Sequence, residues 1–404
     1  MRQARLLMYS HDTYGLGHLR RCRTIAHSLV DYFDNLSVLI VSGSPIIGSF
    51  DFHPRVDFVR IPGAVKLDSG KYASLNPAIG IDDQISMRAS LLKQSAEVYK
   101  PDIFLIDKEP LGLRGEAKDT LVMLKARGTR LVLGIRDVMD EPQKLAAEWD
   151  RKNVIPALED LYDNIWIYGL EQIYNPLKGL GLSQAVKDKM TYTGYLHRSA
   201  STSRINQHSH KLLEDVPYIL VTTGGGGDGV QLIDWVLRAY EHDPDIPYPA
   251  SLVLGPFMNV NQQNTFIDRV NRLEKVSAVT FDANIEDLLE GAIGVVSMGG
   301  YNTFCELLSF DNPGLIVPRT VPRLEQHIRA SRAQELGLCE MLMPEETYDA
   351  ERMAKALHNL ASQSKPSEVH IPGLLGGLSV INMMMERYLR PEDSNALPLT
   401  VVSS

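Results

Sequence analysis

Apolar and polar positions follow two alternating rhythms along this chain. Short aliphatic runs such as Leu36–Ser42 indicate buried strands, and stretches with apolar residues at helical spacing, such as His18–Val30, indicate helices between them. Strands that alternate with helices predict parallel sheets covered by helices. The strands expected on this basis are Arg5–Ser10, Leu36–Ser42, Val56–Ile61, Asp102–Asp107, Arg130–Gly134, Asn164–Gly169, Met190–Gly194, Tyr218–Thr222, Ala250–Leu254, Val279–Phe281, Gly294–Ser297 and Leu315–Val317.

The alternating rhythm stops once, between His197 and Asp215, where polar residues dominate and periodicity is lost. The pattern therefore predicts two doubly wound, Rossmann-like α/β domains that face a cleft. We expect an N-terminal domain over 1–197, a linker over 198–216 and a second domain over 217–372. A Met-rich helix over 373–390 is expected to cross back to the N-terminal domain, and 391–404 to form a tail.

Composition narrows the class of protein. A chain of 404 residues with 44% hydrophobic and 23% charged residues is too long for one core. No apolar run approaches the roughly 20 residues of a membrane-spanning helix, and no secretory signal is visible, so we expect a cytoplasmic protein. Attachment to a membrane surface is kept as an alternative. The formal charge of −9 argues against a nucleic-acid partner.

A glycine-rich loop follows the strand expected at Tyr218–Thr222. Thr223 and four glycines, Gly224–Gly227, precede a segment with the apolar spacing of a helix. Glycine lets the backbone approach a phosphate closely, and free amides at a helix start attract its charge. The spacing fits neither a P-loop nor a dinucleotide fingerprint. We interpret the loop as a phosphate site, and the alternative is a flexible glycine turn.

A second loop of the same kind follows Gly294–Ser297. Gly299 and Gly300 precede an expected helix that contains Glu306. A carboxylate there can accept hydrogen bonds from vicinal hydroxyls such as those of a ribose. Taken alone, Glu306 is more typical of a solvated carboxylate near a helix start. The polar residues that follow the next expected strand, Glu325-Gln326-His327, favour the ligand-binding interpretation instead.

These motifs resemble the donor domain of GT-B glycosyltransferases, in particular the MurG-like family 28, over roughly residues 218–340. The resemblance implies that the glycine loops bind the diphosphate of a nucleotide-sugar, that Glu306 binds the ribose and that Glu325–Gln326 contact the sugar. Asp228 beside the glycines departs from the family pattern. The donor-binding residues implied in this way are Thr223, Gly224, Gly225, Gly226, Gly227, Gly299, Gly300, Asn302, Thr303, Glu306, Glu325 and Gln326.

The first loop of the chain ends in Gly15-Leu16-Gly17-His18. This opening resembles GT-B transferases and, with Arg21, also the PseG-like bacterial nucleotide-sugar hydrolases. The positive end of a helix disfavours an imidazolium, so His18 can be the neutral base that takes a proton from a hydroxyl. The alternative is a structural or exposed histidine. Arg20, Arg21 and Arg23 are typical of a solvated helix face, and only Arg21 is selected, with Gly15 and Gly17, for acceptor binding.

Two further polar residues follow expected strands. Asp107 is expected to border the cleft and to orient His18 or an acceptor, and Arg136 is a candidate acceptor-binding residue. Either one is equally typical of a salt bridge or a helix cap.

The sequence indicates no metal site. Asp243-Pro244-Asp245 has no strand leading into it, and His208-Ser209-His210 has no further ligands near it. Three distant cysteines, Cys22, Cys305 and Cys339, predict reduced structural thiols. We therefore expect neither a metal nor a cofactor.

Together these observations predict a metal-independent glycosyltransferase. It would move a sugar from a nucleoside diphosphate sugar, with UDP expected from the resemblance, to a hydroxyl of a small-molecule, glycan or lipid-linked acceptor. Three alternatives stay open: a nucleotide-sugar hydrolase of the PseG type, a non-catalytic nucleotide-sugar binding protein, and a 2-epimerase on the same fold.

Overall fold

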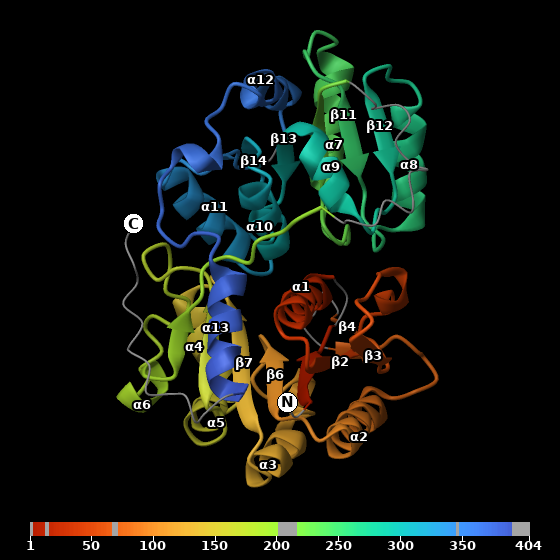
Figure 1. The fold of residues 1–404 in the computed structure, drawn as a ribbon. Coiled ribbons are helices and arrows are strands. Elements are labelled where there is room, and N and C mark those ends of the chain that lie inside the picture. The colour runs from red at the N-terminus through yellow and green to blue at the C-terminus, as the bar shows by residue number, and fades with distance from the viewer. Residues whose placement is uncertain (1–2, 13–15, 67–71, 201–215, 345–346, 390–404) are drawn as a thin grey trace. The chain divides into compact units, whose positions relative to one another are not determined.

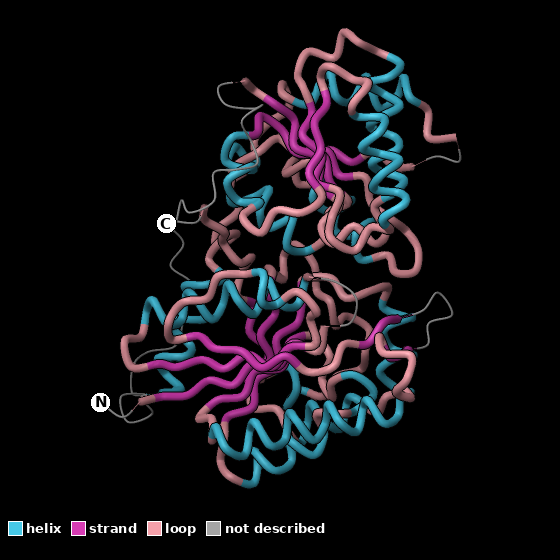
Figure 2. The backbone as a smooth tube through the Cα atoms, turned by 90° about the vertical axis from the view of Figure 1, so that its right-hand side faces the viewer, coloured by secondary structure: helices cyan, strands magenta, loops and turns pink. Residues whose placement is uncertain are grey.

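The structure is a computed structural model that describes residues 3–12, 16–66, 72–200, 216–344 and 347–389. The chain divides into two units. The N-terminal unit comprises Met1–Leu196 with Ile371–Ser404, and the C-terminal unit comprises His197–His370. Figures 1 and 2 show that each unit has its own sheet with helices on both faces. Most of the expected linker (201–215) and the expected tail (391–404) lie outside the described residues.

The N-terminal unit contains a seven-stranded parallel sheet in the order β3-β2-β1-β6-β7-β8-β9. A separate antiparallel hairpin pairs β4 with β5. The elements of this unit are β1 (Ala4–Ser10), α1 (Gly17–Tyr32), β2 (Leu36–Ser42), β3 (Val56–Arg60), β4 (Ala64–Lys66), β5 (Tyr72–Ser74), α2 (Ile81–Tyr99), β6 (Ile103–Asp107), α3 (Lys118–Ala126), β7 (Arg130–Arg136), α4 (Pro142–Arg151), α5 (Val154–Asp160), β8 (Asn164–Tyr168), α6 (Gln184–Lys187), β9 (Met190–Tyr192) and α13 (Gly377–Leu389).

The C-terminal unit contains a six-stranded parallel sheet in the order β12-β11-β10-β13-β14-β15. Its elements are β10 (Tyr218–Thr222), α7 (Val230–His242), β11 (Ala250–Val253), α8 (Val260–Val270), β12 (Val276–Val279), α9 (Ile285–Gly291), β13 (Ala292–Ser297), α10 (Tyr301–Ser309), β14 (Gly314–Ile316), α11 (Glu325–Glu335), β15 (Glu340–Met341) and α12 (Ala350–Leu360).

Both sheets reverse their strand order beside the first strand of the unit. In the N-terminal sheet the reversal lies between β1 and β6, and in the C-terminal sheet it lies between β10 and β13. Doubly wound sheets bind ligands outside the carboxyl ends of the strands at such a switch point. The loops after β1, β10 and β13, which the sequence singled out, lie at these two positions.

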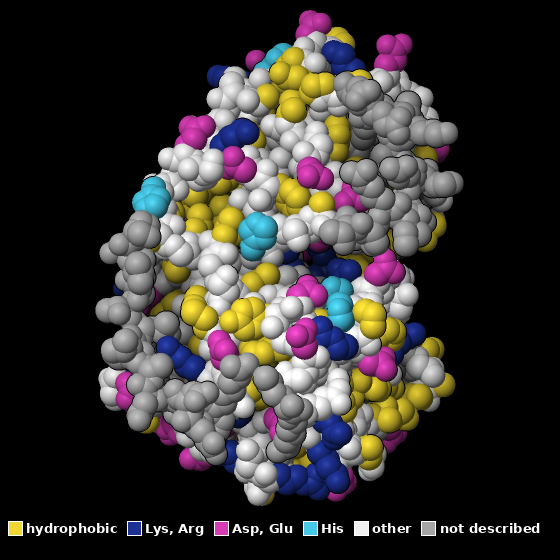
Figure 3. Space-filling model, in the orientation of Figure 1, with side chains coloured by type: hydrophobic (Ala, Val, Ile, Leu, Met, Phe, Trp, Pro, Cys, Tyr) yellow, Lys and Arg dark blue, Asp and Glu magenta, His cyan; other side chains and the backbone are white. Residues whose placement is uncertain are grey.

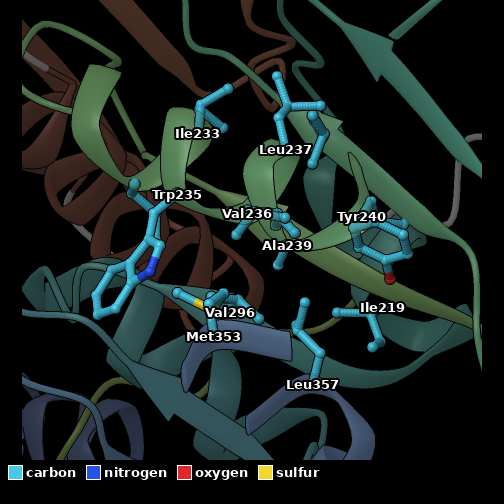
Figure 4. Packing of buried hydrophobic residues seen from close by; sticks show 14 of the residues in the cluster. Ile219, Ile233, Trp235, Val236, Leu237, Ala239, Tyr240, Val296, Met353 and Leu357 are labelled. Atoms are coloured by element: carbon cyan, nitrogen blue, oxygen red, sulfur yellow. The ribbon is translucent and has the colours of Figure 1, made fainter. Parts of the chain in front are cut away.

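The core of the C-terminal unit forms where α7 and α12 cover the sheet (Figure 4). Ile233, Val236 and Leu237 are fully buried on α7, and Met353 and Leu357 on α12. Their spacing of three and four residues places them on one face of each helix, which explains why these segments become helices on this sheet.

Helix α13 belongs to the N-terminal unit, where Figure 1 shows it in blue. It packs on α1, with Asn382 Nδ2 donating to Ser28 Oγ at 3.2 Å. The Tyr388 ring stacks on Trp166 at 6.4 Å, and Arg130 lies 4.4 Å from the centre of the same ring. The helix begins at Gly377, later than expected, because the preceding residues pair with the segment after β9.

Some expected strands differ from the structure. The prediction of a strand over Val279–Phe281 is wrong, because β12 covers Val276–Val279. This edge strand contains Ser277 and Ala278 and is only partly buried, so its apolar pattern is weak. The hairpin of β4 and β5 and the short β15 were not expected at all.

The described surface carries charged side chains of both signs, spread over the face that Figure 3 shows. Among the described residues, no helix combines the length and the apolar character needed to cross a bilayer. All three cysteines are buried free thiols, as predicted.

A buried ion pair supports the loop after β1. Arg88 on α2 and Glu116 are both 0% exposed, with Arg88 Nε 2.6 Å from Glu116 Oε2. Arg88 Nη2 also donates to Tyr9 Oη at 3.0 Å and to the backbone oxygen of His11 at 2.8 Å. The guanidinium therefore ties α2 to the segment that leads towards His18.

Replacing Arg88 by methionine is expected to destabilise the N-terminal unit by about 3 to 5 kcal/mol, because the buried Glu116 carboxylate loses its cation. Urea unfolding measures the change, and the double variant Arg88→Met/Glu116→Gln should recover much of the loss. The control Arg127→Met breaks an exposed pair with Glu97, 41% and 48% exposed, and should cost less than about 1 kcal/mol. Equal small losses in Arg88→Met and Arg127→Met would contradict the structural role of this pair.

Candidate active site

His18, Arg21 and Asp107 are in contact at the switch point of the N-terminal sheet. His18 and Arg21 lie one turn apart at the start of α1, and Asp107 is the last residue of β6. Arg21 Nε donates to Asp107 Oδ1 at 2.8 Å, and Arg21 Nη2 contacts Oδ2. Asp107 Oδ2 also contacts His18 Nδ1. The side chains of Asp107 and Arg21 are 1% and 2% exposed, whereas the His18 side chain is 18% exposed.

The electrostatics of this contact set favour a neutral imidazole. Burial lowers the pKa of His18 to about 4, although the Asp107 carboxylate acts in the opposite direction. The Arg21 guanidinium and the hydrogen bond with His18 outweigh burial and hold the pKa of Asp107 well below its usual range. Asp107 is therefore ionised and can only accept, so His18 donates from Nδ1 and leaves Nε2 as the basic nitrogen.

Asp12 connects the loop after β1 to the start of α1. Its Oδ1 accepts the backbone N–H of Leu19 at 3.3 Å, and its Oδ2 accepts Ser42 Oγ at 3.0 Å and also contacts Ser10 Oγ. Burial raises the pKa of Asp12 to about 7. This carboxylate satisfies one of the free amides in the first turn of α1 and so fixes the helix that carries His18.

A second histidine lies against the first. The rings of His11 and His18 are 4.3 Å apart, edge to face, and His11 is 4% exposed. Burial and the nearby His18 lower the pKa of His11 well below its ordinary value. Both imidazoles are therefore neutral near pH 7.

The acceptor-binding candidates that the sequence predicts in this unit are Gly15, Gly17, Arg21 and Arg136. Gly15 lies outside the described residues, and Gly17 is the first residue of α1, where its oxygen accepts Arg21 Nη1 at 3.1 Å. Arg136 ends β7 and is half-buried. The interpretation of Arg21 as part of a solvated face is wrong, because its guanidinium is turned inward to Asp107.

In the C-terminal unit, Gly224–Gly227 lie between β10 and α7. Gly224 and Gly226 adopt positive φ values of 67° and 86°. A Cβ at Gly226 would overlap the oxygen of Leu254, whereas a Cβ at Gly224 would meet no atom within 4 Å. Thr223 Oγ1 donates to the same Leu254 oxygen at 2.7 Å. Gly226 therefore serves the packing of the loop, and Gly224 is open to a ligand.

Gly299 and Gly300 in the second loop also differ in the space around them. Gly299 has a φ of 71°, and a Cβ there would lie 2.6 Å from Ile316 Cγ2. Gly300 caps the start of α10, and a Cβ there would meet nothing within 4 Å. One glycine permits packing on β14, and the other leaves the helix start open.

Three polar residues of α10 named as donor-binding candidates, Asn302, Thr303 and Glu306, are buried. Asn302 Oδ1 accepts Arg198 Nη2 at 2.9 Å, and Thr303 is 7% exposed. Glu306 lies in the second turn and is 0% exposed. The interpretation of Glu306 as a solvated carboxylate near the helix start is therefore wrong.

Glu325 and Gln326 at the start of α11 are bonded to Arg319. Arg319 Nη2 donates to Glu325 Oε1 at 2.7 Å, and the Arg319 backbone N–H donates to Gln326 Oε1 at 3.0 Å. Arg319 Nε also lies 2.6 Å from Asp228 Oδ2. The residues implied to contact a sugar thus share one arginine with the residue beside the glycine loop.

The sequence did not select four residues that lie in these two sites: His11, Asp12, Arg198 and Arg319. Arg319 follows the strand β14, so the rule that polar residues after parallel strands border a ligand site would have selected it. No local signal marks Arg198, because its partner Asn302 is distant in the sequence.

The described residues contain no cluster of three or more His, Cys, Asp or Glu side chains arranged for a metal ion. Asp243, from the rejected Asp-x-Asp motif, instead contacts His358 Nε2 at 2.9 Å. His208 and His210 lie outside the described residues.

Residues 219–370 match the family model of the glycosyltransferase family 28 C-terminal domain. This range lies within the C-terminal unit and contains both glycine loops, Glu306 and Glu325–Gln326. No curated protein sequence matches the chain significantly.

Solved structures with the same two-unit architecture cover nearly the whole chain. CalG4, the calicheamicin glycosyltransferase, is 13% identical with a TM-score of 0.60, covering 98% of this chain and 100% of its own. Phytolacca americana UGT2, complexed with UDP-2fluoro-glucose and pterostilbene, is 14% identical with a TM-score of 0.58, covering 98% and 97%. The UDP-GlcNAc 2-epimerase from Neisseria meningitidis, bound to UDP-GlcNAc, is 13% identical with a TM-score of 0.62, covering 96% and 100%. The predicted GT-B fold is confirmed.

NMR of the imidazole nitrogens is expected to show His18 neutral at pH 7 and protonated only near pH 4, because burial disfavours the imidazolium. Since this pKa lies below the unfolded value of 6.5, the contribution of His18 to stability is complete above pH 6.5 and is lost as the pH falls towards 4. Asp107→Asn should lower the pKa further, because it removes the charge that raises it.

The control for this titration is Asp102→Asn, immediately before the opposite end of β6, which should leave the His18 titration unchanged. A His18 pKa that rises in Asp107→Asn would refute the assigned coupling.

Proposed function

We propose that this chain, a GT-B glycosyltransferase with a family 28 C-terminal domain, moves a sugar from a nucleoside diphosphate sugar to a hydroxyl acceptor without a metal ion. The observation that carries the proposal is the contact of His18 with Asp107, which leaves a neutral, partly exposed imidazole at a ligand-binding edge. The donor would be a UDP-sugar, as the family resemblance implies.

The glycine loops of the C-terminal unit support a diphosphate site. Gly224 and Gly300 both have open space at the Cβ position, and they precede α7 and α10. Free amides at the start of these helices carry partial positive charge and can hold phosphate oxygens. The same amides would stabilise the charge that develops on the leaving diphosphate.

In the reaction proposed, His18 Nε2 takes the proton of the acceptor hydroxyl. The acceptor oxygen forms a bond to the anomeric carbon, and the bond from that carbon to the diphosphate breaks with its electron pair on the leaving oxygen. Asp107 stabilises the imidazolium that forms, and Arg21 keeps Asp107 ionised and oriented. Arg136 and Gly17 are assigned to acceptor binding.

Glu306 is assigned to the ribose, and Glu325–Gln326 to the sugar, on the strength of the family resemblance. Because Glu306 is 0% exposed, contact with a ribose requires the side chains that cover its carboxylate to move. Asn302 and Thr303, one turn earlier on α10, are assigned to the phosphate side of the donor.

Hydrolysis of the same donor is the second candidate function. The Gly-x-Gly-His18 opening and Arg21 fit the nucleotide-sugar hydrolases equally, and a neutral imidazole activates water as readily as a hydroxyl. Rapid release of free sugar from the donor alone would favour the hydrolase.

Exchanging His18 for alanine is expected to lower the rate of sugar transfer by about a hundredfold to ten-thousandfold, because the acceptor loses its base. The donor is the nucleotide-sugar that most raises the melting temperature of the wild-type protein in a panel. Donor affinity, measured by calorimetry, should be unchanged because the donor residues lie on other elements.

His27→Ala is the matched control, since His27 lies on the same helix α1, and it should retain wild-type transfer. Undiminished transfer in His18→Ala would remove the base assignment, and a panel without any stabilising nucleotide-sugar would overturn the function itself.

Glu306→Gln is expected to abolish the preference for a ribonucleoside diphosphate over its 2′-deoxy counterpart, because a neutral amide binds vicinal hydroxyls more weakly than a carboxylate. Calorimetric dissociation constants for the two ligands measure this preference, which we expect to be about tenfold in the wild type. A variant that weakens both ligands equally would assign Glu306 to the core of α10 alone.

A further inference from the structure

Arg319 joins the two halves of the donor site in the C-terminal unit. Its guanidinium lies 2.6 Å from Asp228, which directly follows the loop Gly224–Gly227. The same guanidinium donates at 2.7 Å to Glu325, the first residue of α11. Arg319 therefore stands between the loop assigned to the diphosphate and the pair assigned to the sugar.

The two acidic partners of Arg319 differ in their surroundings. The Glu325 side chain is 5% exposed, whereas the Asp228 side chain is 52% exposed. An exposed ion pair contributes little to stability because water and salt screen it. Of the two carboxylates that contact Arg319, Asp228 is therefore the one that another anion can replace more readily.

A diphosphate beside Asp228 would compete with this carboxylate for the Arg319 guanidinium. One guanidinium faces two carboxylates, and a diphosphate would add at least two more negative charges beside Asp228. A guanidinium has five N–H donors in a fork that fits phosphate oxygens. Within the part of the chain that the structure describes, Arg319 Nη1 has no hydrogen-bond partner.

We propose that Arg319 binds the diphosphate of the donor, and that Asp228 is a competing anion that holds this guanidinium until the nucleotide displaces it. The inference rests on the proposed function and deepens it. When the bond between the anomeric carbon and the diphosphate breaks, its electron pair passes to the leaving oxygen. Arg319 stabilises that charge in the role that a metal ion fills in other transferases.

The competition predicts opposite effects from two neighbouring charge changes. Asp228→Asn should tighten binding of a nucleoside diphosphate severalfold, because Arg319 no longer has to leave a carboxylate. Arg319→Gln should weaken the same binding by about tenfold to a hundredfold, the usual worth of a charge-assisted hydrogen bond. Neither change should alter binding of the matching nucleoside, which has no phosphate. Calorimetry with UDP, dTDP, GDP and ADP and their nucleosides measures both constants.

Asp234→Asn is the matched control. Asp234 lies in the same unit, its side chain is 40% exposed, and it pairs with Arg238 and Arg269 and not with Arg319. This change should leave diphosphate affinity unchanged. Arg319→Lys keeps the charge and should retain part of the affinity if Arg319→Gln folds poorly.

Weaker or unchanged diphosphate binding in Asp228→Asn would overturn the inference, as would an equal loss of nucleoside and diphosphate binding in Arg319→Gln. A wild-type protein that binds none of the four diphosphates would instead overturn the proposed function, and this inference with it.

Discussion

The candidate site of the N-terminal unit depends on one buried carboxylate. Asp107 ends a strand at the sheet's switch point, where its charge has almost no access to water. A carboxylate in that position is tolerated only with a fixed cation, and Arg21 supplies it from the first turns of α1. Arg21 and His18 lie on one face of this helix. The ion pair that stabilises the buried charge of Asp107 therefore also positions the His18 imidazole.

The candidate site of the C-terminal unit depends instead on backbone amides and on a partly exposed ion pair. Its loops bring backbone amides and glycines to the switch point, and Gly226 and Gly299 are needed for packing, whereas Gly224 and Gly300 leave space. The charged side chains there, Asp228 and Arg319, are paired with each other near the surface, where such a pair is easily exchanged.

These two solutions suit the two chemical tasks assigned to the units. A general base must be unprotonated before the reaction and must then accept a proton, so a neutral imidazole whose Nδ1 contacts an ionised carboxylate is appropriate. A donor site must receive and release a highly charged ligand, so rigid amides combined with an exchangeable ion pair are appropriate. The GT-B fold supplies the same carboxyl-end position to both, and the difference lies in the residues that follow each strand.

The sequence by itself determined the strands β1, β2 and β10, the two-domain organisation and the glycine loops, because apolar spacing and glycine are local signals. It placed Asp107 and His18 at one edge of a sheet by the rule for parallel strands. It failed at β12, where an edge strand has little apolar pattern, and at the hairpin of β4 and β5. Only the tertiary structure decided that Arg21 and Glu306 are buried and that Arg319 meets Asp228, since the partners of a charge come from segments far apart in the chain and no local pattern encodes them.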